Sequence, residues 1–524
     1  MADQTGRSGQ PRSGQPRSSQ PRGRQPRSRQ PDRPRPGNPR SGDPRSAPPR
    51  ADPSRRTAYD VLRAVADRDA YANLLLPALL TERGLTGRDA AFATELTYGT
   101  LRGRGTYDAI LAACSDRDDL DPPVRDVLRL GTHQLLATRV GSHAAVATSV
   151  DLAKDVCGPR PSGFVNAVLR RVSTRDLEAW IDSVAPSLSQ DPTGHLAVRH
   201  SYPRWIVEAF RDALGDASVA EIENALAAGN LRPDVVLALT PADPAGAASV
   251  LPAGEPTRWS PYGFRLAGGD PAPLVASGQA AVQDEASQLA ALALTRVGLS
   301  GPDELWLDLC AGPGGKSRLL SGLAAARGAR LVASDIRPQR ARRVLETLRR
   351  AEQAEPAPAA TQPGTGANRA RTHTAAVVAA DGRQVPWPSG TFDRVLADVP
   401  CSGLGSLRRR PEARWRKTPE GVMELAVLQR ELLEAAIDSV RPGGVVAYVT
   451  CTPHLTETRE VVTAVADRRD DVTVLDAPSV LSEVPDLRCP EPRRSSDPRY
   501  RRFAQFWPHR HGTDAIFLAL LRRG

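Results

Sequence analysis

The stretch "ELWLDLCAGPGGKS" (residues 304–317) joins an apolar run to a helical pattern through a glycine-rich turn. Cys310 stands where a GxxxxGK[ST] phosphate-binding loop needs glycine, and Ser317 stands at the third glycine of a GxGxxG motif. We therefore expect neither a nucleoside triphosphate nor a dinucleotide here. The glycines still allow a ligand to lie close to the backbone, and the acid that precedes the turn can meet a cationic or amine group.

Strands and helices alternate along the chain around this turn, after a helix with its entry loop at 278–294. The strand patterns cover residues 304–310, 330–336, 375–381, 392–399, 443–451 and 515–521, and an arginine-rich helix is expected around 337–350. A low-complexity loop rich in Ala, Pro, Gly and Thr interrupts the series at 351–372. The alternation predicts an α/β Rossmann-like domain, with a largely parallel sheet that has helices on both faces.

Acidic residues end three successive strands of this pattern, and the first of them is the acid before the glycine turn. Asp335 ends the second strand, where it can bond the two hydroxyls of a ribose, and Asp381 ends the third, where it can accept from an adenine amine. A single acid at a strand end is often only a helix N-cap, but three beside a glycine turn favour a ligand. They indicate an adenosyl group without phosphates, and S-adenosylmethionine is the candidate. Lys316, one of only three lysines among 70 basic residues, lies in the same turn.

Two of the six cysteines also end strands, Cys401 in "ADVPCSG" and Cys451 in "YVTCTPH". Ligands and chemistry gather at the carboxyl ends of the strands in a doubly wound sheet. The alternative, a buried thiol that only packs, suits Cys114 or Cys157 on apolar helices better. A thiolate beside a methyl donor can add to C6 of cytosine, which makes C5 able to take the methyl group. A base must then remove the C5 proton to release the enzyme.

Several motifs together resemble the RNA cytosine-C5 methyltransferases of the Nop2/Sun type. In chain order they read "QDEASQL", "DLCAGPGGKS", "SDI", "DVPCSGLG", "YVTCT" and "HGTDAIFLALL". The resemblance covers about residues 57–524 and is closest to the bacterial branch of the family that acts on 16S ribosomal RNA. The paired Pro-Cys and Thr-Cys motifs are specific to the RNA enzymes, since similar DNA enzymes lack the second motif.

The resemblance, and not the chemistry alone, implies which cysteine attacks the base. Cys451 would add to the cytosine ring, Cys401 would assist proton removal and product release, and Asp398 would bond the ring. The same resemblance implies that the cofactor pocket is lined by Cys310, Ala311, Gly312, Pro313, Gly314, Gly315, Lys316, Asp335, Asp381 and Asp398. No metal ion is expected.

Four regions are expected along the chain. Residues 1–54 form a basic tail rich in Arg, Pro, Gln and Ser, which we expect to be disordered because it has almost no apolar side chains to bury. Residues 55–195 have helical periodicity, and "GFVNAVLRRV" within them resembles the last helix of NusB-like RNA-binding domains. Residues 196–277 predict a small α+β module, similar to an RNA-binding insert of the family, and residues 278–524 predict the methyltransferase domain.

The net charge of +10 lies entirely in residues 1–56, which hold fourteen arginines and four aspartates. An RNA-binding surface on the rest of the chain must then be a local patch. The stretch "GSLRRRPEARWRK" (405–417) is a candidate, because its basic side chains surround Trp415 and directly follow the Pro-Cys motif. The scattered cysteines, the arginine-rich N-terminus and the lack of an eighteen-residue apolar span predict a cytoplasmic protein without disulfides or a membrane anchor.

Together these patterns predict an S-adenosylmethionine-dependent monomer that forms 5-methylcytosine in RNA. The substrate is expected to be one cytosine of small-subunit (16S) ribosomal RNA, either unpaired or splayed out, since stacking would shield its face from the thiol. Two alternatives stay open. One is the same chemistry on transfer RNA, and the other is a non-catalytic NusB-like RNA-binding factor that keeps the methyltransferase fold.

Overall fold

The computed structural model describes residues 51–117, 119–215, 217–241, 253–354, 375–482 and 498–524. Contacts between residues join the described residues into one unit. Three parts of the chain named by the sequence lie outside the described residues: Cys489, nearly all of the basic tail, and the stretch "DPAGAASVL" (243–251), whose pattern predicts a helix. The tail is shorter than predicted at its C-terminal end, because the first helix already begins at Pro53.

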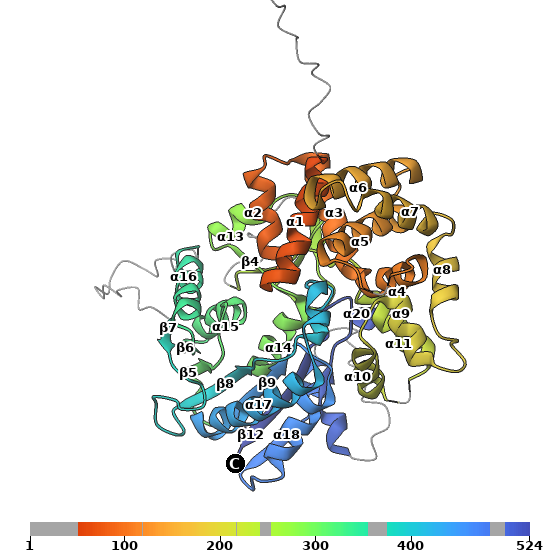
Figure 1. The fold of residues 1–524 in the computed structure, drawn as a ribbon. Coiled ribbons are helices and arrows are strands. Elements are labelled where there is room, and N and C mark those ends of the chain that lie inside the picture. Colours follow the sequence, from red (N-terminus) through yellow and green to blue (C-terminus); the bar gives the residue numbers. More distant parts are fainter. Residues whose placement is uncertain (1–50, 118, 216, 242–252, 355–374, 483–497) are drawn as a thin grey trace, which may run out of the picture. The chain divides into compact units, whose positions relative to one another are not determined.

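The N-terminal half of this unit is helical (Figure 1). Its helices are α1 (Pro53–Arg68), α2 (Ala72–Glu82), α3 (Gly87–Arg102), α4 (Arg104–Cys114), α5 (Pro122–Ala137), α6 (Ser142–Cys157), α7 (Ser162–Val172), α8 (Leu177–Val184), α9 (Pro192–His200), α10 (Arg204–Leu214) and α11 (Val219–Ala228). The predicted helical region is confirmed, and it continues about thirty residues into the stretch expected to be mixed.

Helix α1 shows why these segments fold as they do. Asp52 caps its N-terminus by accepting a hydrogen bond from the Arg55 amide, and Pro53 occupies the first turn, where its missing N–H costs nothing. Apolar residues at three- and four-residue spacing turn inward along α1, α3, α5 and α7. Val61, Leu96 and Val127 are fully buried in the resulting core.

A small sheet follows α11, with strands β1 (Val236–Leu239), β2 (Gly254–Pro256), β3 (Gly263–Leu266) and β4 (Ala280–Val282) in the order β2-β3-β1-β4. All of its pairings are antiparallel. A short helix, α13 (Ala272–Ala276), precedes β4. The run "DVVLALTP" (234–241), whose pattern predicts a strand, contains β1. Residues 280–282 pair with β1, so the expected entry loop of the next helix is instead a strand.

The second, larger sheet has the order β10-β12-β9-β8-β5-β6-β7, with β11 paired to β12. Its strands are β5 (Leu305–Asp308), β6 (Arg330–Asp335), β7 (Ala375–Ala379), β8 (Phe392–Asp398), β9 (Val440–Thr450), β10 (Val472–Leu475), β11 (Ala504–Gln505) and β12 (Phe517–Arg523). Strands β5 to β9 are parallel, whereas β12 is antiparallel to β9 and to β10. The predicted largely parallel sheet is confirmed, with an antiparallel edge that the sequence pattern did not distinguish.

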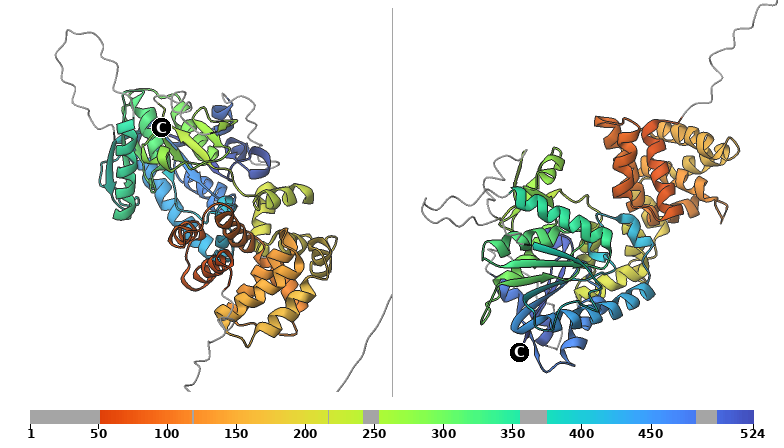
Figure 2. Two further views of the ribbon diagram at one scale, coloured as in Figure 1. Left: turned by 90° about the horizontal axis from the view of Figure 1, so that it is seen from above. Right: turned by 90° about the vertical axis from the view of Figure 1, so that its left-hand side faces the viewer.

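Helices cover both faces of the larger sheet (Figure 2). On one face lie α14 (Glu285–Arg296), α15 (Gly315–Ala325) and α16 (Pro338–Ala354), and on the other lie α17 (Pro419–Ser439) and α18 (Arg459–Ala466). Adjacent strand residues point to opposite cores, so Trp306 packs with α14 and α15 while Leu307 packs with α17. Burial on both faces explains why these strands read as continuous apolar runs.

The remaining elements are short: η2 (Leu404–Ser406), η3 (Pro411–Trp415), η4 (Leu455–Glu457), α19 (Ala477–Leu481), η5 (Pro498–Arg502) and α20 (Pro508–His511). Helix α16 ends at Ala354, so the first four residues of the predicted low-complexity loop are helical, and the others lie outside the described residues. Ala351, Glu352 and Gln353 are good helix formers, which accounts for the extension. Among the described helices, none is both long and apolar enough to cross a membrane.

Candidate active site at the carboxyl edge of the larger sheet

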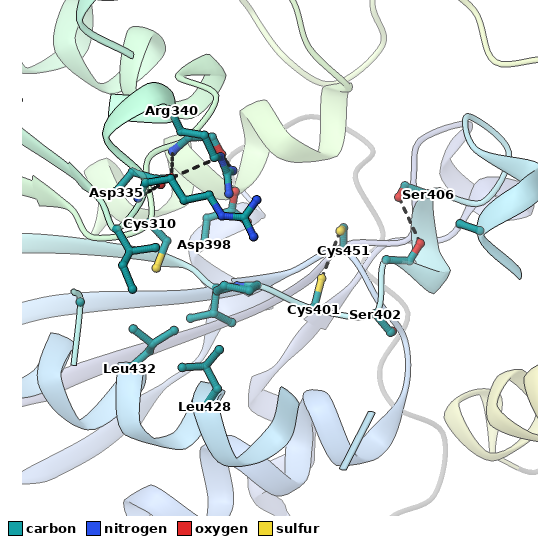
Figure 3. Close-up of a pocket in the computed structure, with 18 of the residues that line it drawn as sticks. Cys310, Asp335, Arg340, Asp398, Cys401, Ser402, Ser406, Leu428, Leu432 and Cys451 are labelled. Atoms are coloured by element: carbon teal, nitrogen blue, oxygen red, sulfur yellow. Dashed lines mark hydrogen bonds and ion pairs between the residues drawn. The ribbon is translucent and has the colours of Figure 1, made fainter. Parts of the chain in front are cut away.

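A cavity of about 1080 Å³ lies where the parallel strands of the larger sheet end (Figure 3). Its lining comes from the ends of β5, β6 and β8, from the loops that follow β7 and β9, from η3, and from the loop between α1 and α2. The volume is at the upper end of the ~300–1,000 Å³ found for small-molecule sites. The cavity is therefore large enough for more than one ligand group.

The glycine turn after β5 brings backbone close to the acid that ends β6. A Cβ on Gly312 would lie 2.3 Å from Asp335 Oδ2, and Gly314 adopts φ +112°, so both positions require glycine. Asp335 accepts hydrogen bonds from the Gly312 amide at 3.1 Å and from the Arg337 amide at 2.9 Å. These bonds fix a nearly buried carboxylate at the cavity wall, where a ribose can be bonded.

Two more acids flank this position. Asp308, beneath the turn, is fully buried, and burial raises its pKa to about 7 although the Ser317 hydroxyl donates to its Oδ2 at 2.6 Å. Asp381 lines the cavity two residues beyond β7, and hydrogen bonds from the Arg383 side chain and amide lower its pKa. Asp381 therefore stays a charged acceptor at the far end of the cavity.

Lys316 reaches across from the start of α15 to Asp398 at the end of β8. The Lys316 Nζ lies 2.8 Å from Asp398 Oδ2, and both side chains are largely withdrawn from solvent. Burial would lower the pKa of Lys316, but the Asp398 carboxylate outweighs it and the pKa is raised. This ion pair joins the glycine turn to the "DVPC" loop and places a fixed positive charge near the cysteines.

The two strand-end cysteines face each other in the cavity wall (Figure 3). Cys401 Sγ and Cys451 Sγ are 3.2 Å apart, a distance at which one thiol donates a hydrogen bond to the other sulfur. The hydrogen bond from Cys401 lowers the pKa of Cys451, against the effects of burial and of the Asp398 charge, and Lys316 acts in the lowering direction. The same contact and burial raise the pKa of Cys401 well above its ordinary value.

A buried carboxylate that the sequence analysis missed, Glu457 in η4, holds the two cysteine loops together. It accepts a hydrogen bond from the Ser402 amide at 2.7 Å, and the Ser402 hydroxyl bonds to the same carboxylate. That hydroxyl also lies 3.1 Å from Thr452 Oγ1, and Gln429 of α17 donates to Glu457 at 3.0 Å. Ser402 and Thr452 directly follow the cysteines, and that adjacency is the only sequence signal that could have identified this network.

Most arginines of the basic stretch 405–417 are occupied by internal contacts, so its expected role as an RNA-binding patch stays a prediction for the cations that remain. Arg414 is fully buried, lies 3.8 Å from the Tyr202 ring centroid and donates to the Ser201 carbonyl at 2.9 Å. Arg416 donates to carbonyls at the C-terminal end of α1, including Ala70 at 2.7 Å. The internal contacts of these arginines could not be predicted from the charge pattern, because the carbonyls and rings that contact them come from distant segments.

Two further arginines of this stretch form a buried four-charge cluster with two aspartates. Arg408 and Arg409 each bond to Asp284, at 2.9 and 2.8 Å, and to Asp514, at 2.5 and 2.7 Å. Burial raises the pKa of Asp284, and Asp514 adds to the increase. The cluster ties the loop after Cys401 to the "QDE" and "GTD" motifs, so it anchors one side of the active site.

Removing one aspartate of this cluster is expected to destabilise the protein strongly. Asp514→Ala leaves the buried Arg408 and the partly buried Arg409 guanidinium groups with one carboxylate, and breaking a buried pair costs about 3–5 kcal/mol. Urea unfolding followed by circular dichroism measures this free energy. The control is Glu434→Ala, which removes the exposed Arg468–Glu434 pair and should cost less than ~1 kcal/mol. Equal losses for the two variants would contradict the structural role of the cluster.

The structure brings most of the predicted site residues to one cavity. Cys310, Gly312, Asp335, Asp381, Asp398, Cys401 and Cys451 line it. Ala311, Pro313, Gly314, Gly315 and Lys316 belong to the same turn but do not line it, and Lys316 acts on the cavity through its bond to Asp398. Burial raises the pKa of Cys310 well above its ordinary value, so this thiol suits a wall position rather than chemistry.

The lining fits S-adenosylmethionine. Carboxylates at the ends of successive strands suit ribose hydroxyls, an adenine amine and an ammonium group, and the turn leaves no Cβ at Gly312 to block a close approach. When bound, S-adenosylmethionine supplies an electrophilic methyl group. Asp335 and Asp381 would hold its adenosyl part, and the thiols lie farther along the same wall (Figure 3).

Comparison with known proteins agrees with this geometry. Residues 299–357 and 364–522 match the family model described as 16S rRNA methyltransferase RsmB/F, and residues 52–174 match the NusB family. A methyltransferase of Mycobacterium tuberculosis is 49% identical over 484 residues, which span 90% of this chain and 96% of the relative. The ribosomal RNA small subunit methyltransferase B of Pseudomonas putida is 31% identical over 454 residues, which span 84% of this chain and 94% of that protein.

Among solved structures, the protein PH0851 superposes with a TM-score of 0.68 at 20% identity, over 90% of this chain and 98% of that one. At this identity the likeness concerns the fold. The family match and the relatives agree with the acids and paired thiols of the cavity, and together they lead to one conclusion. The chain belongs to the RsmB/F family of S-adenosylmethionine-dependent RNA methyltransferases, with a NusB-family region on the N-terminal side of its catalytic domain.

Proposed function

We propose that this protein methylates C5 of one cytosine in small-subunit (16S) ribosomal RNA through a covalent bond between Cys451 and C6 of the base. The observation that carries the proposal is the pair of thiols 3.2 Å apart at the carboxyl edge of the sheet, in the cavity that also contains the cofactor acids. A second thiol beside the nucleophile has no use in simple methyl transfer. A second thiol is useful where a proton must leave C5 after the methyl group arrives.

The Cys451 thiolate adds to C6 of the cytosine, and the ring's π electrons move toward N3, where a proton neutralises them. Asp398 lines the cavity three residues before Cys401 and is the proposed partner of the ring's N3–N4 edge. C5 then carries the electron density that takes the methyl group, and the sulfonium sulfur that gives it up becomes a neutral thioether. Cys401 assists removal of the C5 proton, the C5–C6 double bond forms again, the N3 proton is released, and the Cys451 sulfur leaves C6 as a thiolate.

Small-subunit ribosomal RNA is favoured as the substrate because the relative from Pseudomonas putida carries that substrate in its name and covers nearly the whole chain. The target base must be unpaired or flipped out, since a stacked cytosine presents neither face of C6 to a thiol in a cavity wall. The transfer RNA alternative keeps the same chemistry. A cytoplasmic location and a monomeric state stay predictions.

The test is transfer of labelled methyl from S-adenosylmethionine to unmodified small-subunit ribosomal RNA, with transfer RNA as a parallel substrate. We expect label in the ribosomal RNA, recovered as 5-methylcytosine after nuclease digestion. Label in transfer RNA alone would keep the reaction and overturn the substrate. Label in neither RNA, nor in small ribosomal subunits, together with no binding of labelled cofactor, would favour the non-catalytic RNA-binding alternative.

A further inference from the structure

The α1–α2 loop contributes an exposed aromatic ring to the wall of the catalytic cavity. Tyr71, just before α2, lines the cavity together with Cys401 and Cys451, although 330 residues of chain separate it from the first of them. Tyr71 is 46% exposed, so its ring is accessible at the cavity wall. A solvent-facing ring in the wall of a cavity that accepts RNA is suited to stacking on a base.

Hydrogen bonds on both sides of Tyr71 fix its backbone, and they hold the ring at the cavity wall. Asp69 adopts a left-handed conformation with φ 51° at the end of α1, and Arg416 donates to the Asp69 carbonyl at 3.0 Å. On the other side, the Ala72 amide donates to the buried Glu412 carboxylate at 3.1 Å. The Arg416 cation lies at the C-terminus of α1 and the Glu412 anion lies at the N-terminus of α2, so each charge is opposite in sign to the end of the helix dipole that it meets.

Two cations of stretch 405–417 line the same cavity as this ring and have no carboxylate partner among the described residues. In the part of the chain that the structure describes, neither Arg410 nor Lys417 forms an ion pair, and both line the cavity. The Arg410 guanidinium lies 5.4 Å from the Tyr71 ring centroid. Arg416 also lies over this ring, at 5.6 Å, but its donors are taken by main-chain carbonyls. Arg410 and Lys417 are thus the cations of stretch 405–417 left to meet phosphates.

We propose that Tyr71, Arg410 and Lys417 form a binding subsite for the nucleotide next to the target cytosine. Tyr71 stacks on the neighbouring base, and the two cations contact the flanking phosphates as the target base turns toward Cys451. The inference rests on the proposed RNA substrate and adds to it a positioning site that joins Tyr71 of the NusB-family region to two cations of the methyltransferase domain. The cavity has a volume of about 1080 Å³, which leaves room for more than one ligand group.

Stacking of a base on an aromatic side chain predicts which variants fail. Tyr71→Ala should raise KM for ribosomal RNA about 10- to 100-fold, with kcat changed less, because the lost stacking acts on RNA binding. Tyr71→Phe keeps the ring and should stay within about threefold of wild type. The matched control is Leu74→Ala on the same helix, which removes an apolar side chain that is 69% exposed and does not line the cavity.

The cations are tested through the salt dependence of binding to a short fluorescein-labelled single-stranded RNA. Each of Arg410→Gln and Lys417→Gln should reduce the slope of log affinity against log salt by ~0.7. Unchanged KM in Tyr71→Ala, or equal losses in Tyr71→Phe and Tyr71→Ala, would overturn the stacking contact. Unchanged salt slopes would overturn the phosphate contacts.

This binding measurement separates failure of the subsite from failure of the proposed function. If wild type binds the labelled RNA, Tyr71→Ala binds it at least ~10-fold more weakly, and neither methylates RNA, the subsite is supported and the methylation proposal fails. If wild type methylates RNA and Tyr71→Ala binds and methylates equally well, the reaction stands and the subsite is wrong. Thermal unfolding at the wild-type temperature in all variants confirms that the effects are local.

Discussion

Cys451→Ala is expected to lower kcat/KM for methyl transfer to small-subunit ribosomal RNA by at least ~10³-fold, because C5 of cytosine is a poor nucleophile until a thiolate adds to C6. Cys451 is the proposed nucleophile, and the hydrogen bond from the Cys401 thiol lowers its pKa. Incorporation of labelled methyl into RNA measures the loss, and binding of labelled cofactor should stay near the wild-type level.

A matched control removes a thiol elsewhere in the chain. Cys157 is half-buried on α6 and does not line the cavity, so Cys157→Ala should retain methyl transfer within about twofold. Wild-type rates in Cys451→Ala would contradict the covalent mechanism. Loss of activity with simultaneous loss of cofactor binding would instead indicate a damaged fold, and Cys451→Ser, which keeps the size of the side chain, distinguishes these outcomes.

Cys401→Ala is expected to accumulate a covalent protein–RNA adduct. Without Cys401, attack by Cys451 loses a hydrogen bond that lowers the Cys451 pKa, whereas release loses the group proposed to assist departure of the C5 proton, which must leave before the sulfur can. Loss of a general base typically costs 10²–10⁴-fold, so release becomes the slow step and turnover stalls with the bond to RNA intact. A slowly migrating band on a denaturing gel that collapses after ribonuclease treatment reports the adduct.

The double variant Cys401→Ala with Cys451→Ala is the decisive companion to that gel. It should show no slow band, because no thiol remains at the ring. A band that persists in the double variant would mean that another nucleophile attacks the base. A band in Cys451→Ala instead of Cys401→Ala would reverse the roles assigned to the two thiols.

The sequence by itself was enough to predict that four candidate site residues lie at one edge of the sheet, because the carboxyl ends of parallel strands are found together there. Asp335, Asp398, Cys401 and Cys451 each end an apolar strand pattern, and in a doubly wound sheet all such ends meet at one edge. Strand identity was therefore enough to predict that these side chains share a cavity. The glycine turn could also be recognised from the sequence, because Gly314 needs a backbone conformation that other residues rarely adopt.

Only the tertiary structure decided which side chains surround these candidate site residues. Glu457 holds both cysteine loops through Ser402, and Asp284 and Asp514 bind Arg408 and Arg409, yet none of these pairings follows from spacing along the chain. A charged side chain looks solvent-exposed in a sequence until folding shows which carbonyl or carboxylate meets it. Tyr71 reaches the cavity for the same reason, because the contact that places its loop joins Ala72 to Glu412 across 340 residues. Contacts of such separation depend on how whole elements pack, and no local pattern records that.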